Sequence, residues 1–543
     1  MSEWIAPGPG SWKLDTAHFE TTVSRPMRDL IELAMPSGMS EGFELVGAPL
    51  KTIDVGFVNG RMYQRLTPLV GGGRDLPTPP RRVLWLLTRL HPTFRQRAKQ
   101  SVRAIGERFW LQEFARWERE WKPKLNATNR RLGDVDAAAL SDAGLAAHLN
   151  TVWRHVEWAG SLHFRLHTSD LAPIGRLLTA ARSWGLDERH VMTTLAGASP
   201  ATSAPTRALN VIADELSRVG AEAATLSDVR EASTAAAELL DEYLAEFGNR
   251  VTTGYDLRDR TLRELPEVIL ASIQHSRSAD SPDIVGDQAF SSLLEQIDES
   301  NRAEFTNLVE EARTLYGLRD ENGPLTVEWP AGIARHVILE AGRRLVARGA
   351  LDDLEHVFDA AVPELVGLLE GSEYPLAAEL GIRHRERFGW GALTPPPVLG
   401  SIAEPPDIDI DILPGRMPEM MRAVMTVTTL LDSADQTDSL SGTGVGTTSY
   451  QGIARVVADA DEAFERADPG DIIVTRLTVP TFNSVLAMAG GVVTEAGGLL
   501  SHTAVIAREL GIPAVIGVAG ALTDIPDGAE IILDPVAGTV TIV

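Results

Sequence analysis

One histidine in the C-terminal part of the chain stands where it could carry covalent chemistry. His502 follows Gly497-Gly498, where the backbone can adopt a positive φ, and Ser501 before it is a residue type that caps helices. The pattern predicts a helix that begins near His502. Helix N-termini stabilise anions, so a phosphoryl group on His502 would be held by Gly498, Ser501 and Thr503. A plain helix start after a glycine turn has the same spacing.

Two further side chains near His502 could assist it. Glu495 stands at the expected end of a strand and could bind one ring N–H of His502, which fixes the tautomer and leaves the other nitrogen nucleophilic. Arg508 could lie one to two turns along the same helix. That separation is too large for the sequence to assign it a phosphate contact.

A second group of candidates shares one helical stretch. His155, His163 and His167 are spaced by eight and four residues, so they fall on one face of an expected helix. They could act as a base or orient a hydroxyl group, and Trp158 and Phe164 could pack against a ring. A His pair four residues apart can also bind metal, and packing or surface histidines have this spacing too. The sequence shows no acidic third ligand nearby, so no metal is expected.

The composition limits the classes of partner. The formal net charge is −25, which opposes non-specific attraction to nucleic acid or anionic lipid. The chain has no cysteine, so disulfides, thiolate metal sites and a cysteine nucleophile are excluded. The N-terminus lacks a basic segment followed by an apolar one, and no run of about 20 apolar residues occurs. We expect a cytoplasmic protein without nucleic-acid or membrane partners.

The spacing of apolar residues, glycines and prolines predicts the helices and strands that must position these residues. Asn59-Gly60 between apolar runs predicts a hairpin in a small β-containing N-terminal region. From about Leu84 to Gly389 apolar residues recur at helical spacing, and residues 226–247 predict a helix closed by Gly248. Two proline clusters in residues 391–415 predict a linker.

The C-terminal part has a different pattern. A helix is expected from about Met417 to Ser433, and short apolar runs then alternate with helical patterns. Strands such as 472–475 are continuously apolar, as in sheets covered by helices. The fold class is α+β multidomain, with a mainly helical domain over 1–390, a linker and hinge helix over 391–439, and a small α/β domain over 440–543.

A resemblance sharpens the interpretation of His502. The string GGLLSHTAVIARELGIPAVIGV resembles the phosphohistidine signature of the swivelling, or mobile, domain of PEP-utilising enzymes such as pyruvate phosphate dikinase, phosphoenolpyruvate synthase and rifampin phosphotransferase. The likeness covers about residues 440–543. It implies that His502 accepts a phosphoryl group and carries it between two active sites. Thr478 and Pro480 match the family's T-x-P turn, which implies an orienting role for Thr478, although strand-end turn residues need no such role.

The rest of the chain resembles part of such enzymes. Before the linker, the opening of the chain and the segments VNGRMY and EYLAEFGNRVTTGYDLRDRTLRELPEVIL look similar to the helical acceptor-binding domain of rifampin phosphotransferase. The family's Tyr-Gly-His-Arg run is here Phe247-Gly248-Asn249-Arg250, so any role of that histidine does not carry over. No segment resembles an ATP-grasp donor domain, and Gly71-Gly72-Gly73 is an isolated loop rather than a phosphate-binding motif. The barrel that binds phosphoenolpyruvate does not follow the swivel, so that ligand is not expected.

This layout resembles the His-bearing subunit of two-component dikinases, such as phenylphosphate synthase or hydroxyphenylethanone-phosphorylating enzymes. It implies that a separate ATP-grasp subunit, which binds ATP and Mg²⁺, phosphorylates His502, and that this chain binds no cofactor tightly. The swivel would then turn on a hinge within 391–450 and pass the group to a small phenolic hydroxyl. Acceptor-site candidates are His155, His163, His167 and Trp158, with Arg25, Arg28 and Arg61 to neutralise phosphate. A phosphohistidine carrier or regulatory protein, and an inactive relic, remain as alternatives.

Overall fold

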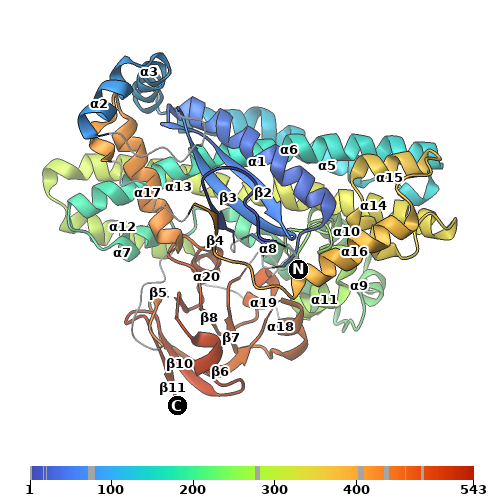
Figure 1. The fold of residues 1–543 in the computed structure, drawn as a ribbon. Helices are drawn as coiled ribbons and strands as arrows, with labels where there is room; N and C mark the ends of the chain where they lie inside the picture. The colour runs from blue at the N-terminus through green and yellow to red at the C-terminus, as the bar shows by residue number, and fades with distance from the viewer. Residues whose placement is uncertain are drawn as a thin grey trace. The chain divides into compact units, whose positions relative to one another are not determined.

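The computed structural model (Figure 1) describes most of the chain and divides it into two compact units. Unit 1 consists of residues 1–170, 254–260 and 322–421, and unit 2 of residues 171–253, 261–321 and 422–543. The described residues are 3–15, 18–19, 21–70, 80–252, 254–274, 282–401, 409–432, 440–458, 460–478 and 482–543.

Unit 1 contains a small antiparallel sheet with the strand order β2-β3-β1-β4. Val58 pairs with Arg61, and Asn59 and Gly60 between them both have positive φ, 48° and 71°. These angles fit a two-residue hairpin turn and confirm the predicted hairpin. Helix α1 packs on β2 (Figure 1). The bounds are β1 Ser11–Leu14, α1 Arg25–Val46, β2 Leu50–Val58, β3 Arg61–Pro68 and β4 Val398–Gly400.

Helices make up most of the remainder of unit 1. The π-helical turn η4 (Pro324–Glu328) interrupts the run from α13 (Glu299–Gly323) to α14 (Trp329–Ala347). Single π turns inside α-helices occur often at functional sites. The other elements are α2 Arg81–Leu90, α3 Pro92–Gly106, α4 Phe109–Arg116, η1 Trp117–Trp121, α5 Lys122–Gly133, η2 Ala137–Ala139, α6 Asp142–Ser183, η5 Leu354–Asp359, α15 Val362–Leu369, α16 Ala377–Gly391 and η6 Ile410–Ile412. The element η1 is a second π-helical turn, which lies between α4 and α5. Of α6, only the residues up to 170 belong to unit 1.

The helices of unit 2 include one departure from the predicted pattern. The helix expected over 226–247 is two helices, α9 (Leu226–Ala232) and α10 (Thr234–Glu246), because Ser233 is extended and its hydroxyl accepts the N–H of Ala236. A serine that caps the following helix competes with helix continuation. The C-cap is Phe247, one residue before Gly248. The others are α7 Glu188–Thr193, α8 Pro200–Val219, η3 Leu262–Glu264, α11 Pro266–Gln274, α12 Pro282–Gln296 and α17 Met417–Asp432.

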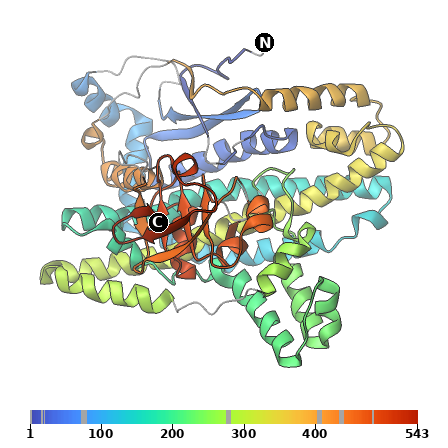
Figure 2. The same ribbon diagram turned by 90° about the horizontal axis from the view of Figure 1, so that it is seen from below.

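Unit 2 ends in a mixed sheet with the order β11-β10-β6-β7-β8-β9-β5, seen from below in Figure 2. Strands β6 to β9 are parallel, and β5, β10 and β11 pair antiparallel to their neighbours. The bounds are β5 Thr443–Val445, β6 Tyr450–Val456, α18 Ala460–Arg466, β7 Ile472–Thr475, α19 Asn483–Leu486, β8 Gly491–Thr494, α20 His502–Leu510, β9 Ala514–Ile516, α21 Ala521–Asp524, β10 Glu530–Asp534 and β11 Thr539–Ile542.

The expected fold class, a large helical region followed by a small α/β domain, is confirmed. Every residue of β7 and β8 is buried, as predicted for strands covered by helices. One apolar core joins the α20 side of this sheet to side chains of α13, among them Phe305 and Tyr316. The predicted boundaries at 390 and 440 stay a prediction, while α17 begins at the expected Met417. Within the described part of the chain, no helix has the length and apolar character required to cross a membrane.

Candidate functional site

His502 is the first residue of α20, as predicted. The chain leaves β8 and turns through Gly497, whose φ of 109° is in the left-handed region that favours glycine. Ser501 is the N-cap of α20, and its hydroxyl accepts the N–H of Ala504. This places His502 at the carboxyl end of a parallel strand and at a helix N-terminus, two places where α/β proteins bind anions.

Two arginines of unit 2 hold the loop that precedes His502. Arg319 of α13 donates from Nη2 to Leu500 O at 2.7 Å. Arg508 of α20 donates to Leu499 O at 2.6 Å and to the Tyr316 hydroxyl at 3.4 Å. Arg319 Nη1 and Arg508 Nε are buried and have no hydrogen-bond partner among the described residues. Both guanidinium groups therefore keep unused donors beside the His502 loop.

The environment of His502 keeps its imidazole neutral. Burial and the positive charge of Arg319 lower the pKa of His502 to about 4. At neutral pH the ring therefore carries a lone pair that can attack phosphorus. The sequence offered no signal for Arg319, because it lies 183 positions before His502 and only tertiary packing brings them together.

The other predicted residues of this loop have defined places. The hydroxyls of Thr478 and Thr503 are buried and lie 2.7 Å apart, so they bond to each other. Glu495 is half-buried directly after β8 and donates its backbone N–H to Thr475 O. Their roles, and the phosphate-stabilising roles of Gly498, Ser501 and Thr503, stay predictions. Pro480 lies outside the described residues.

In unit 1 the structure brings His163 and His167 of α6 into one chain of polar contacts. Their Nε2 atoms are 3.1 Å apart. His163 Nδ1 lies 3.1 Å from the hydroxyl of Thr326 in η4, and His167 Nδ1 lies 3.2 Å from the buried carboxylate of Asp170. Burial, His167 and His18 lower the pKa of His163 well below its ordinary value. Both nitrogens of each ring are thus engaged.

Asp170 corrects the expectation that no acidic group lies near these histidines. It follows His167 by three residues on the same helix, a spacing that the sequence shows plainly. In the part of the chain that the structure describes, no group of three or more His, Asp or Glu side chains is arranged to hold a metal ion.

His155 and Trp158 belong to a neighbouring cluster on α6. His155 is buried, and its Nε2 lies 2.7 Å from Asn129 Oδ1, while Asn129 donates to Leu325 O. Burial, with Arg131 and Lys124, lowers the pKa of His155 to about 4. His155 and His163 have different partners, Asn129 of α5 and Thr326 of η4.

Two of the three predicted arginines, Arg28 and Arg61, lie at the end of α16. The guanidinium of Arg28 lies 6.0 Å from the Trp390 ring, and Arg61 donates to Gly391 O at 3.3 Å. Burial is the main reason that the pKa values of the Arg28 and Arg61 guanidinium groups are lowered. Arg25 is instead exposed and forms an ion pair with Asp29. Their role toward phosphate stays a prediction.

A pair that the sequence analysis overlooked lies beside the α6 histidines. His18 Nδ1 is 2.9 Å from Asp15 Oδ2, and the ring of His18 lies 6.2 Å from that of Tyr255. The spacing Asp-x-x-His was the available signal. We call Asp15, His18, His163, His167 and Asp170 the histidine cluster of unit 1.

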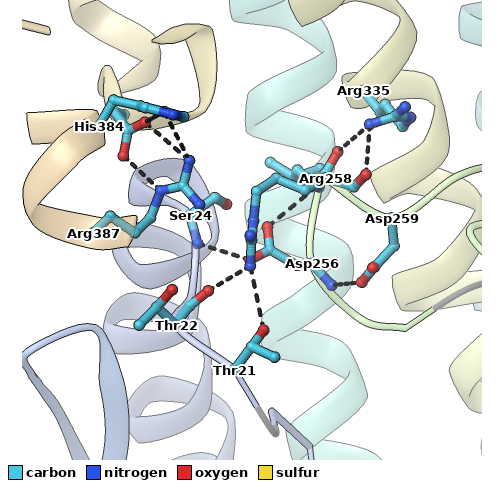
Figure 3. A network of polar contacts seen from close by, with 11 residues as sticks. Thr21, Thr22, Ser24, Asp256, Arg258, Asp259, Arg335, His384 and Arg387 are labelled. Atoms are coloured by element: carbon cyan, nitrogen blue, oxygen red, sulfur yellow. Dashed lines mark hydrogen bonds and ion pairs between the residues drawn. The ribbon is translucent and has the colours of Figure 1, made fainter. Parts of the chain in front are cut away.

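A polar network, drawn in Figure 3, fixes the segment 254–260 that carries Tyr255. The carboxylate of Asp256 accepts the N–H of Ser24 at 2.7 Å and bonds to the guanidinium of Arg258. Arg258 also reaches Thr22 O, and Arg335 of α14 donates to Leu257 O and Arg258 O. Tyr255 therefore stands on a segment anchored to α1 and to α14.

Comparison with known proteins agrees with the geometry around His502. Residues 467–538 match the family model of the PEP-utilising enzyme mobile domain. The chain is 25% identical over 321 residues to the uncharacterised phosphotransferase YvkC of Bacillus subtilis, a match that covers 56% of this chain and 36% of that protein. It is 31% identical over 230 residues to rifampicin phosphotransferase of Streptomyces sviceus, covering 42% of this chain and 24% of that protein.

A third relative matches along nearly the whole chain. Chondramide synthase cmdD of Chondromyces crocatus is 24% identical over 578 residues, which cover 98% of this chain and 14% of that protein. The matches span 36% or less of these three curated relatives. The C-terminal part of this chain is therefore a PEP-utilising enzyme mobile domain, in a chain distantly similar to rifampicin phosphotransferase and YvkC.

Proposed function

We propose that this chain is the phosphotransferase subunit of a two-component dikinase. In this proposal a separate ATP-grasp subunit, with ATP and Mg²⁺, phosphorylates His502, and the phosphoryl group then passes to the hydroxyl of a small phenolic acceptor. The observation that carries the proposal is a neutral His502 at the N-terminus of α20, within the segment that matches the mobile-domain model.

In the first step a ring nitrogen of His502 attacks the β-phosphorus of ATP on the partner. The N–P bond forms as the bond from the β-phosphorus to AMP breaks, so AMP leaves and a pyrophosphoryl group stays on His502. Water then attacks the γ-phosphorus, inorganic phosphate leaves, and the β-phosphoryl group remains on His502. A protonated imidazole has no free lone pair, so the low pKa of His502 favours this step at neutral pH.

Once on His502, the phosphoryl group meets several donors in unit 2. The N-terminal N–H groups of α20 favour an anion. The unused donors Arg319 Nη1 and Arg508 Nε would each gain a charge-assisted hydrogen bond from a phosphoryl oxygen. These contacts support storage of the group on His502 between the two half-reactions.

In the second step the acceptor hydroxyl attacks phosphorus, and the electron pair of the N–P bond returns to His502. Such transfers depend mainly on positioning and charge neutralisation. The histidine cluster of unit 1 supports an acceptor site there, because Phe164 and Tyr255 lie 5.0 Å and 6.2 Å, ring to ring, from His163 and His18. Aromatic neighbours of this kind favour a ring-bearing acceptor.

The proposal is tested with ATP labelled at the β position, a candidate ATP-grasp partner, and three proteins: wild type, His502→Ala and His190→Ala. His190 is exposed on α7 and serves as the matched control. Acid-labile label on wild type and His190→Ala but not on His502→Ala, removed by added phenol, is the expected result. Label that stays on His502 with phenol present favours the carrier alternative, and no label with several active partners overturns the ATP-driven reaction.

A further inference from the structure

The Asp15–His18 pair is built as a carboxylate that holds an imidazole. Asp15 follows β1 and its side chain is 2% exposed. Besides His18 Nδ1, its carboxylate accepts the backbone N–H of His18 at 2.9 Å and Gln64 Nε2 at 3.2 Å. A buried carboxylate fixed by these donors orients the ring and selects the tautomer with the proton on Nδ1.

The second ring nitrogen of His18 distinguishes it from His163 and His167. The side chain of His18 is 47% exposed, and its Nε2 has no hydrogen-bond partner among the described residues. In contrast, both ring nitrogens of His163 and of His167 are engaged. Within the histidine cluster, His18 is therefore the side chain that presents a basic nitrogen accessible to a ligand.

The surroundings of His18 suit a hydroxylated ring. Tyr255 lies across from it at 6.2 Å with the ring planes inclined by 55°, on the segment that the network of Figure 3 anchors. His163 is close enough for His18 to lower its pKa. The groups that face His18 are thus Asp15 from its own segment, Tyr255 from segment 254–260, and His163 from α6.

We infer that His18 is the base that accepts the proton of the acceptor hydroxyl, with Asp15 as its positioning residue. This rests on the proposed function. As the acceptor oxygen bonds to phosphorus, its proton moves to Nε2 of His18, and the electron pair of the breaking N–P bond returns to His502. The products are the phosphorylated acceptor, neutral His502 and a His18 imidazolium, which releases its proton to solvent.

The electrostatics of His18 agree with that role. Burial lowers its pKa, but the charge of Asp15 and the hydrogen bond to it outweigh this and raise the pKa above 6.5. A carboxylate that raises the pKa of an imidazole in this way makes the ring a stronger proton acceptor. His18 is protonated and inactive below its pKa, so phosphoryl transfer to the acceptor falls as the pH drops through that value.

The test follows the second half-reaction alone. Wild type, His18→Gln and the control His190→Gln are phosphorylated with potassium phosphoramidate, which needs no partner, and label on His502 is taken as the difference from His502→Ala. Loss of that label is then timed with phenol and, in parallel, with water as acceptor. Loss of label in water alone is subtracted, so the rate compared between the variants is that of transfer to phenol.

We expect His18→Gln to retain its label on His502 but lose it about 10²- to 10⁴-fold more slowly than wild type, as removal of a general base does. His190→Gln should match wild type. Added imidazole should restore the rate in His18→Ala, and Asp15→Asn should shift the acid limb of the pH profile to lower pH, which a merely structural role would not do.

Equal rates for His18→Gln and wild type, with the same pH profile, overturn the assignment of His18 while leaving the proposed function standing. A wild type that takes no label on His502 from ATP and any partner instead refutes the proposed function. The two failures are therefore distinguishable.

Discussion

Arg319 offers the most direct perturbation of the phosphohistidine site. Burial and Arg319 together lower the pKa of His502 from 6.5 to about 4, which corresponds to roughly 3 kcal/mol against the imidazolium. Burial is the larger cause, so Arg319 accounts for less than half. Arg319→Gln should raise the pKa of His502 by up to about one unit, while Arg319→Lys, which keeps the charge, should leave it low.

The pKa is measured by NMR titration of the protein labelled with ¹⁵N-histidine. The chain has 12 histidines, and the spectrum of His502→Ala assigns the relevant signal. Arg218→Gln is the control, because this arginine of α8 is 67% exposed and pairs with Glu215. At pH 7 His502 remains neutral in all variants, so its protonation does not limit phosphorylation.

Arg319→Gln should also weaken retention of the phosphoryl group on His502. A charge-assisted hydrogen bond contributes about 1.5–3 kcal/mol, so Arg319→Gln should reduce the equilibrium yield of phosphorylated His502 by roughly 10- to 100-fold. A His502 pKa near 6.5 in wild type, or an unchanged pKa and yield in Arg319→Gln, would refute the reasoning. It would mean that the Arg319 charge does not act on His502.

Two further predictions concern buried polar groups. Thr503→Val should lower the free energy of unfolding by about 1–3 kcal/mol, because the buried hydroxyl of Thr478 loses its partner. In chemical denaturation, the double variant Thr478→Val, Thr503→Val should lose less free energy of unfolding than the sum of the two single variants. Additive losses would argue against a hydrogen bond between the two hydroxyls. Burial and Asp256 raise the pKa of Asp259 from 3.8 to about 7, so its contribution to stability is complete below about pH 3.8 and is lost as the pH rises through 7. Asp259→Asn should flatten the fall in unfolding free energy across that window, whereas the same slope as in wild type would contradict the assignment.

Local patterns predicted the elements around His502 well. Gly497 has the positive φ that the glycine pair suggested, Ser501 caps α20, and His502 begins it. The hairpin at Asn59-Gly60 and the start of α17 at Met417 could likewise be predicted from the sequence. Each depends on residues within a few positions of each other, where backbone sterics and capping act directly.

Two predictions from local pattern were wrong because a contact between residues close in sequence was overlooked. Ser233 splits the helix expected over 226–247, because its hydroxyl caps α10. Asp170 was missed as a partner of His167 although it lies on the next turn of the same helix. Both signals were present in the sequence, since a capping serine and a spacing of three residues need no tertiary information.

The sequence by itself determined where an anion-binding helix start carries a histidine, and which helical face holds His155, His163 and His167. Only the tertiary structure decided which charges act on these groups. Arg319 reaches His502 across 183 positions, and His18 meets His163 across 145. Electrostatic interactions and burial depend on distance in space, and long-range packing sets that distance, so neither the low pKa of His502 nor the accessible nitrogen of His18 is encoded in any local pattern.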